Sequence, residues 1–225
     1  MHSENRLPDS LSERRVRRSG AWGFALVAAL GCSAAMAGTG HVPTDQDTYP
    51  EPIAAIPAVL GQCFACHGPN GRSEYLDWPS LAGQKQSYLL QQLRDFKSGA
   101  RKHPMMQPVV AVLSDDDLKT AADYLSKRPP PQPQPQPAGN KAVTTGKPPV
   151  AAVACIACHD NAALPTEPYL NAQQVDYLVA QIHAFKAGVR NNEVMQALVA
   201  NLSDEEIYDI AAYFSAQTHI SSTEK

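Results

Sequence analysis

The hydrophobic residues of this chain recur at helical spacing. Leu89, Leu93 and Phe96 fall at i, i+4 and i+7, which places their side chains on one face of an amphipathic helix. That helix is expected to end at Gly99, because glycine readily takes the left-handed conformation that closes a helix. The same pattern recurs further along the chain at Leu178, Ile182, Phe185 and Gly188.

A second helix in each stretch is predicted from its first turn. Ser114 is followed three residues later by Asp117, and Ser203 by Glu206, which is the capping-box signature of a helix start. Apolar residues then follow at helical spacing, namely Leu118, Ala121, Ala122 and Leu125 in the first copy and Ile207, Ile210, Ala211 and Phe214 in the second. No clear strand alternation accompanies them, so the chain is expected to be all-α.

The two stretches are copies of one repeat in constant register. Pro79, Leu81, Tyr88, Phe96, Gly99, Arg101, Met106 and Tyr124 fall on Pro168, Leu170, Tyr177, Phe185, Gly188, Arg190, Met195 and Tyr213. Between the copies lies a Pro/Gln-rich spacer that runs into a Gly/Thr/Lys segment, a composition typical of a linker. The sequence therefore predicts two tandem helical domains, 53–128 and 150–219, joined by a linker at 129–149.

Each copy contains the motif C-x-x-C-H, at residues 63–67 and 155–159. This spacing attaches c-type haem, because two thiols add across the two vinyl groups of one porphyrin and hold the adjacent imidazole beneath the iron. The first motif provides Cys63, Cys66 and His67, and the second provides Cys155, Cys158 and His159. Two covalently bound haem c groups are expected.

Two other uses of a C-x-x-C pair fit less well. A zinc ribbon would place its second pair about 15–20 residues after the first, whereas most of a domain separates Cys66 from Cys155. A thioredoxin-like motif expects a βαβ context, which the helical periodicity does not provide.

The N-terminal segment is typical of an export signal. Arginines at 14, 15, 17 and 18 form a basic region, 21–34 is apolar, and 35–37 offers an A-x-A cleavage site. We expect residues 1–37 to be a cleaved signal peptide and 38–52 an N-terminal tail, with an uncleaved anchor or lipidation at Cys32 as alternatives that would associate the protein with a membrane.

Cleavage after Ala37 would remove five arginines and three acids and so change the net charge from −3 to −5. An acidic mature protein gives no electrostatic support for nucleic-acid binding and favours partners with a basic docking patch.

The sixth iron ligand can be inferred from the methionines. Without the leader, Met105, Met106 and Met195 remain. The repeat register pairs Met106 with Met195 and sets Met105 against a valine, so Met106 and Met195 are the predicted distal ligands, with core packing as the alternative for both. His103 and His183 are weaker candidates, since neither has a histidine counterpart in the other copy.

These residues together resemble a dihaem class I cytochrome c of the cytochrome c4 type. The resemblance is carried by residues 63–68 with Gly71, by 79–84, by 99–106 and by 113–115, with their second-half partners. It implies two tandem class I cytochrome c domains, in which the carbonyls of Pro79 and Pro168 accept the Nδ1–H of the proximal histidines. The second copy departs from this pattern at 160–162, which lacks the glycines of the first loop, and at 171–172, where Asn-Ala replaces Ala-Gly.

For two pairs of matched residues the sequence allows two roles each. Arg101 and Arg190 could bind haem propionates or could be cations near a helix C-terminus. Tyr88 and Tyr177 could pack on or near the haem or serve as ordinary core residues.

The resemblance implies a periplasmic electron carrier that transfers single electrons between a quinol-oxidising bc-type complex and a terminal oxidase. The alternative is an electron-accepting cytochrome subunit of a periplasmic dehydrogenase that oxidises sulfide, thiosulfate or alcohol. An enzyme is the weakest of the three hypotheses, because two His/Met pairs leave no open iron position.

Overall fold

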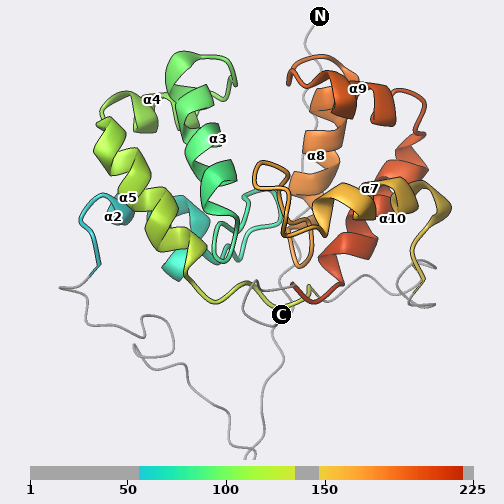
Figure 1. The fold of residues 1–225 in the computed structure, drawn as a ribbon, viewed down its shortest axis with the longest axis horizontal. Helices are drawn as coiled ribbons and strands as arrows, with labels where there is room; N and C mark the ends of the chain where they lie inside the picture. The colour runs from blue at the N-terminus through green and yellow to red at the C-terminus, as the bar shows by residue number, and fades with distance from the viewer. Residues whose placement is uncertain (1–55, 135–146, 220–225) are drawn as a thin grey trace, which may run out of the picture. The chain divides into compact units, whose positions relative to one another are not determined.

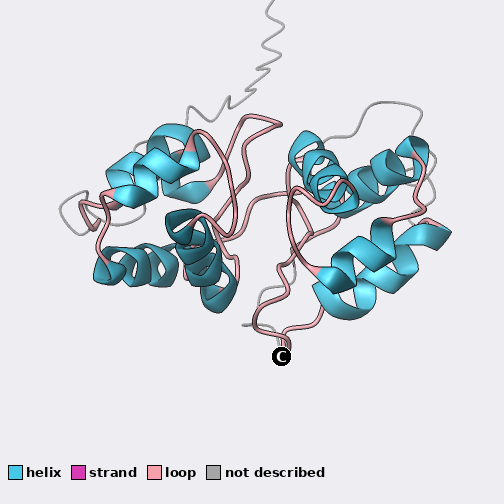
Figure 2. Ribbon diagram, turned by 90° about the horizontal axis from the view of Figure 1, so that it is seen from above, coloured by secondary structure: helices cyan, strands magenta, loops and turns pink. Residues whose placement is uncertain are grey.

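The computed structural model describes residues 56–134 and 147–219, and all of them belong to one compact unit. The expected signal peptide, the N-terminal tail and Cys32 lie outside the described residues. Within the described ranges every regular element is a helix and no strand occurs (Figure 2), so the all-α prediction is confirmed. No helix there is both long and apolar enough to cross a membrane.

The α-helices of the two repeats follow in the same order (Figure 1), whereas a short 3-10 helix follows the first α-helix of repeat 1 and precedes that of repeat 2. Repeat 1 comprises α2 (Leu60–His67), η2 (Pro69–Gly71), α3 (Gln86–Ser98), α4 (Met106–Ala111) and α5 (Asp115–Ser126). Repeat 2 comprises η3 (Val150–Ala152), α7 (Val153–His159), α8 (Val175–Lys186), α9 (Glu193–Val199) and α10 (Asp204–Ser215). In repeat 1, α3 packs against α4 and α5, and in repeat 2, α8 packs in the same way against α9 and α10.

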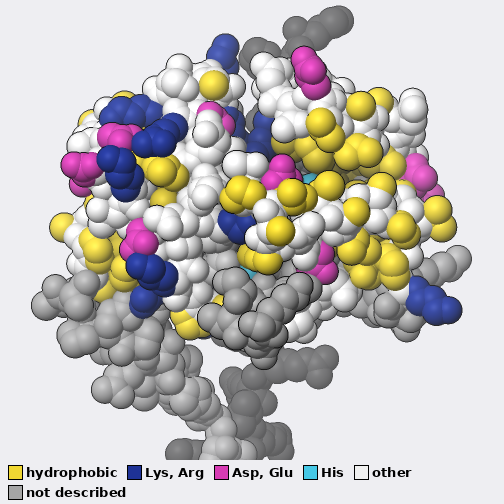
Figure 3. Space-filling view, viewed as in Figure 1, with side chains coloured by type: hydrophobic (Ala, Val, Ile, Leu, Met, Phe, Trp, Pro, Cys, Tyr) yellow, Lys and Arg dark blue, Asp and Glu magenta, His cyan; other side chains and the backbone are white. Residues whose placement is uncertain are grey.

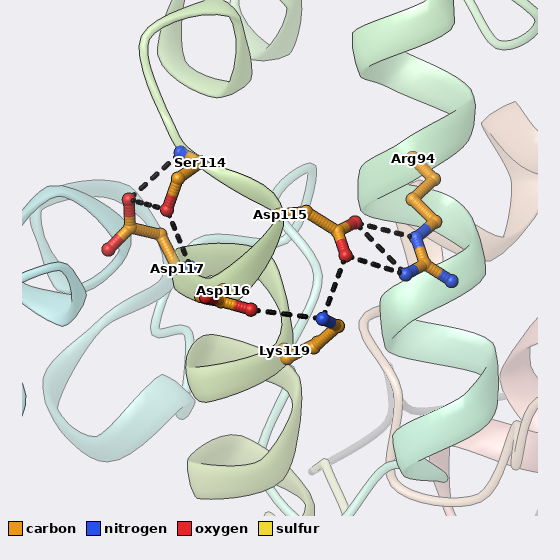
Figure 4. A network of polar contacts seen from close by, with 6 residues as sticks. All are labelled: Arg94, Ser114, Asp115, Asp116, Asp117 and Lys119. Atoms are coloured by element: carbon orange, nitrogen blue, oxygen red, sulfur yellow. Dashed lines mark hydrogen bonds and ion pairs between the residues drawn. The ribbon is translucent and has the colours of Figure 1, made fainter.

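The predicted capping boxes are present at the starts of α5 and α10. The hydroxyl of Ser114 accepts a hydrogen bond from the backbone N–H of Asp117 at 3.1 Å, and the Asp117 carboxylate accepts one from the N–H of Ser114 at 2.8 Å (Figure 4). Arg94 of α3 binds both carboxylate oxygens of Asp115 at 2.9–3.0 Å. The reciprocal bonds satisfy backbone donors that a helix start leaves unpaired, while the arginine ties α3 to α5.

Each repeat has its own hydrophobic core, and the apolar residues expected in α5 and α10 lie in it. The core of repeat 1 is built on Leu60, Leu89, Ala121, Ala122 and Leu125. In repeat 2 the core is built mainly on Val175, Leu178, Ile182, Phe185, Val199, Ile207, Ile210, Ala211, Tyr213 and Phe214. As predicted, glycines in the left-handed conformation close the long helices, with φ +81° at Gly99 and +69° at Gly188. The amphipathic pattern therefore produces two similar helical units.

The repeats contact each other through two matched amide pairs. The side chain of Gln84 donates to the carbonyl of Tyr169 at 2.9 Å and accepts from its N–H at 3.0 Å. Gln173, the counterpart of Gln84, makes the same two bonds to Ser80, at 2.9 and 2.8 Å. Each repeat thus presents the same residues to the other, as in an isologous dimer interface.

Candidate haem sites

The paired cysteines lie on the short helices α2 and α7, each of which ends at the motif histidine. All four thiols are free. Burial raises the pKa of Cys63 to about 11 and also raises that of Cys155, whereas reactive or metal-binding cysteines have a lowered pKa. No group of three or more potential metal ligands of the zinc type occurs in the described ranges. The raised pKa of Cys63 and Cys155 is thus unlike the lowered pKa of redox-active cysteines.

Both motif histidines are held by a proline carbonyl. Nδ1 of His67 lies 2.8 Å from the carbonyl oxygen of Pro79, and Nδ1 of His159 lies 2.8 Å from that of Pro168. A carbonyl only accepts, so Nδ1 carries the proton and Nε2 keeps the lone pair of the neutral imidazole. Burial lowers the pKa of both rings, which favours this neutral form. Each histidine is thus oriented to offer Nε2 to a metal.

At position 172, repeat 2 keeps the backbone conformation of repeat 1 although it has alanine in place of glycine. Gly83 has φ +71°, and its counterpart Ala172 takes the same left-handed conformation with φ +57°. The N–H of Gly83 donates to the carbonyl of Leu125 at 3.0 Å, and that of Ala172 donates to Phe214 at 3.0 Å. The replacement of glycine by alanine therefore leaves this loop unchanged, at the cost of backbone strain at Ala172.

A cavity of about 600 Å³ lies next to the motif of repeat 2. Cys155, Cys158 and His159 line one part of it, and Met195 lines another. Its apolar walls include Leu178, Ile182, Phe185, Val199, Leu202 and Phe214. Two thiols, an oriented imidazole and a thioether around an apolar cavity are the donor set and the environment that a haem c requires.

Met106 and Met195, which the repeat register pairs, are both more buried than Met105. Met105 is 61% exposed, whereas Met106 and Met195 are partly buried. Met195 is the third residue of α9, and its N–H is capped by the side chain of Asn192 at 2.9 Å. The short helices α4 and α9, which carry Met106 and Met195, were not predicted from the sequence.

The two histidines that were considered as other ligands are engaged elsewhere. His103 is exposed and packs edge-on against Phe96. His183 lies 3.9 Å from the carboxylate of Asp204. Neither of them lines the cavity of repeat 2.

Arg101 and Arg190 belong to a symmetric polar network between the repeats. Arg101 donates to the phenol oxygen of Tyr177 at 3.2 Å, and Arg190 donates to that of Tyr88 at 3.1 Å. Each guanidinium also lies 4.5 Å from the ring centre of a phenylalanine in its own repeat. Among the described residues neither guanidinium pairs with a carboxylate. Both arginines line the cavity, to which they contribute positive charge.

The sequence reasoning missed three residues around this site. Gln92 and Gln181 each accept hydrogen bonds from both arginines, at 2.6–3.0 Å. They share the repeat register, so extending the alignment along the helix would have found them. Lys85 has no lysine counterpart in repeat 2 and left no such signal.

Lys85 of repeat 1 supports the loop that follows the motif in repeat 2. Its ammonium group donates to the carbonyls of Asn161 and Leu164 at 2.7 and 2.6 Å and lies 4.4 Å from the ring centre of Tyr169. Partial burial lowers its pKa. A cation from one repeat thus closes the glycine-poor loop beside the histidine of the other.

Comparison with known proteins gives consistent matches. The cytochrome c family model matches residues 54–129. A cytochrome c4 from Thiocapsa roseopersicina is 34% identical over 175 residues, which cover 72% of this chain and 91% of that protein. A thiosulfate dehydrogenase electron acceptor from Stutzerimonas stutzeri (strain A1501) is 33% identical over 175 residues, which cover 72% of this chain and 81% of that protein.

A solved structure agrees with these relatives. Reduced recombinant cytochrome c4 from Pseudomonas stutzeri matches with a TM-score of 0.62 and 29% sequence identity, over 71% of this chain and 95% of that chain. The match spans both repeats of a two-domain helical protein.

Proposed function

The chain belongs to the cytochrome c4 family of dihaem class I cytochromes c, and on that premise we propose that it carries single electrons between a quinol-oxidising bc-type complex and a terminal oxidase. Its two covalently bound haem c groups supply a one-electron Fe(III)/Fe(II) couple. We place this function in the periplasm, in keeping with the export signal expected at residues 1–37.

The observation that carries the proposal is the arrangement of His159 and Met195 on the cavity of repeat 2. The Pro168 carbonyl holds the His159 ring so that Nε2 serves as the proximal ligand. Met195 would hold the iron through its thioether sulfur, a ligand type that favours the reduced state. His67, Pro79 and Met106 have the same roles in repeat 1.

A His/Met pair at each iron leaves no coordination position for a substrate. The residues therefore support an electron carrier rather than an enzyme. The chain's own contribution is to fix the ligands, exclude water with the apolar walls, and compensate the charge of the carboxyl groups of the porphyrin. We assign that last role to Arg101 and Arg190, which line the cavity and pair with no carboxylate of the described residues.

A second candidate function is the electron-accepting subunit of a dehydrogenase. The similarity to a thiosulfate dehydrogenase electron acceptor favours it. The same His/Met sites would serve, because carrier and subunit differ only in the surface that meets the partner.

The ligand assignment is tested by Met106→Ala and Met195→Ala in the haem-loaded protein. Each variant should remove about half of the weak long-wavelength absorption band that accompanies Met–Fe(III) ligation. If both variants keep the whole band, the assignment is wrong.

Purification of the native protein separates the two candidate functions. A carrier is expected to elute alone, whereas a subunit is expected to elute with a dehydrogenase that reduces its haems when the substrate of that dehydrogenase is added.

A further inference from the structure

The two repeats carry opposite charge. Residues 56–134 contain nine Lys and Arg against seven Asp and Glu, a net charge of +2. Residues 147–219 contain three against eight, a net charge of −5. The acidity expected of the whole mature protein is therefore concentrated in repeat 2, and in the view of Figure 3 the basic side chains gather over repeat 1.

The difference arises at matched positions of the two repeats. Where repeat 1 has Lys102, Lys119, Lys127 and Arg128, repeat 2 has Asn191, Tyr208, Ala216 and Gln217. In repeat 1, three carboxylates of α5 pair with Lys or Arg. Within the described part of repeat 2, no Asp or Glu pairs with Lys or Arg. The described part of repeat 2 thus offsets its negative charge with fewer ion pairs to Lys or Arg than repeat 1 does.

Apolar side chains are exposed beside the haem cavity of the same repeat. Val150 and Val153, next to cavity-lining alanines of η3 and α7, are 92% and 57% exposed. Val194 and Leu198 of α9 line the cavity and are 67% and 48% exposed. We call these four residues the apolar rim. Figure 3 shows hydrophobic side chains gathered over this half of the molecule.

Carboxylates accompany the apolar rim. Glu193 is exposed and directly precedes Val194 in α9, and Glu167 lines the cavity. At the positions that correspond to Val150 and Val153, repeat 1 has Ala58 and Gly61, so the motif helix of repeat 1 lacks this apolar surface. Large exposed apolar patches with a polar surround mark interaction sites.

We propose that the apolar rim of repeat 2 is the docking surface for a basic redox protein whose own cofactor edge is apolar and surrounded by Lys or Arg. The proposal rests on the electron-carrier function. It specifies that repeat 2 contacts the partner and that the contact combines apolar packing with charge attraction. The acidic repeat steers the partner by long-range attraction, and the apolar rim brings the two cofactors close. One electron then moves between the haem iron of repeat 2 and the partner's redox centre, so that one is oxidised as the other is reduced.

The test uses the full chain with both haems in the ferric state and a zinc-substituted mitochondrial cytochrome c as the basic probe. The photoexcited zinc porphyrin donates one electron to ferric haem, and the rate constant of its quenching measures productive docking. With the wild-type protein this rate constant should fall steeply as salt is added.

Val153→Lys places a positive charge in the apolar rim, and Gly61→Lys makes the same addition at the matched position of repeat 1. Gly61 is exposed, and a side chain there meets nothing within 4 Å. At low salt, Val153→Lys should lower the quenching rate constant about tenfold, whereas Gly61→Lys should lower it less than twofold. Glu193→Gln, a milder change, should lower it several-fold.

Four results decide between the docking surface and the underlying carrier function. Equal effects of the two lysine variants, or quenching that does not fall with salt, would overturn the docking surface. Oxidation of the dithionite-reduced variants by ferricyanide, an anionic oxidant, should stay at least as fast as in wild type, which shows intact haem sites. If the wild-type protein itself is not reoxidised by ferricyanide in one-electron steps, the carrier function fails and not merely the docking surface.

Discussion

The guanidinium of Arg101 in repeat 1 donates a hydrogen bond to the phenol oxygen of Tyr177 in repeat 2, over a distance of 3.2 Å. Arg190 returns the same contact to Tyr88 at 3.1 Å. Both bonds join residues that occupy matched positions in the internal repeat. The polar network and the glutamine amide pairs therefore form one interface with approximate two-fold symmetry, which can be perturbed on either side.

The amide pairs give the first prediction, that Gln173→Leu destabilises the haem-loaded protein. Ser80 is buried, and both its N–H and its carbonyl are paired with the Gln173 side chain. Leucine would leave both groups buried and unpaired, so the free energy of unfolding should fall by about 3 kcal/mol. Urea unfolding followed by circular dichroism measures this change. The exposed Gln86→Leu should change it by less than about 0.5 kcal/mol, and an equal loss in both variants would refute the role of the amide pair.

The long helices α3, α5, α8 and α10 and their pairing in register could be predicted from the sequence because apolar spacing and capping are local signals. Leu89 and Phe96 lie in or beside the core as their spacing required, and Ser114 caps α5 through Asp117. The contacts between the repeats could not be predicted in this way, since Gln84 and Gln173 look like ordinary surface amides until the other repeat is in place. The one sequence signal for these contacts was that Gln84 and Gln173 occupy matched positions of the repeat.

The second prediction concerns Gly83→Ala. Gly83 has φ +71°, and an added Cβ would lie 2.9 Å from Cβ of Pro130. The left-handed conformation and the close contact together should lower the free energy of unfolding by about 2 kcal/mol. Gly61→Ala is the control, because it lies in a helix with open space around it, and it should leave the stability unchanged or raise it slightly. A harmless Gly83→Ala would show that Pro130 moves freely aside.

Ala172 explains why the departure from the family pattern in repeat 2 does not disturb the site. The sequence showed that a glycine was missing at this position, and it gave no means of deciding whether the loop would change. In the structure Ala172 takes φ +57° and donates to Phe214, as Gly83 donates to Leu125. The Phe214 carbonyl near the end of α10 accepts the hydrogen bond from Ala172 and so favours this loop conformation. Phe214 is distant from Ala172 in the sequence, so local sequence signals could not reveal the contact.

The third prediction is a pH dependence of the capping box. Hydrogen bonds from the hydroxyl and N–H of Ser114 hold the pKa of the Asp117 carboxyl below its ordinary value of 3.8. A carboxyl with a lowered folded-state pKa stabilises the protein above its ordinary pKa and loses this effect as the pH falls through the folded-state value. Asp117→Asn should therefore lower the Tm at pH 7 by a few degrees, as for the loss of part of a cap.

The difference in Tm between wild type and Asp117→Asn should shrink as the pH is lowered below about 4. Asp77→Asn is the control, because Asp77 is exposed and no described residue donates a hydrogen bond to its carboxylate. Its Tm should follow that of wild type at every pH. A difference for Asp117→Asn that persists unchanged in acid would mean that the ionised carboxylate is not what stabilises the helix start.

The last prediction concerns Lys85, whose ammonium group donates to the carbonyls of Asn161 and Leu164 beside the motif of repeat 2. A nearby positive charge stabilises the reduced, less positive iron, so Lys85→Met should lower the reduction potential of the haem of repeat 2 on the order of tens of millivolts. The haem of repeat 1 should change less, because the contacts of Lys85 described above lie in the loop of repeat 2. Lys85→Arg keeps the charge and should largely preserve both potentials.

Spectroelectrochemical titration, with the two haems assigned through Met106→Ala and Met195→Ala, measures these shifts. A shift in Lys85→Met that falls equally on both haems would indicate a general loss of packing between the repeats. A shift confined to repeat 2 would show that one domain adjusts the potential of the haem held by the other, through a single cation placed at the loop where glycine is missing.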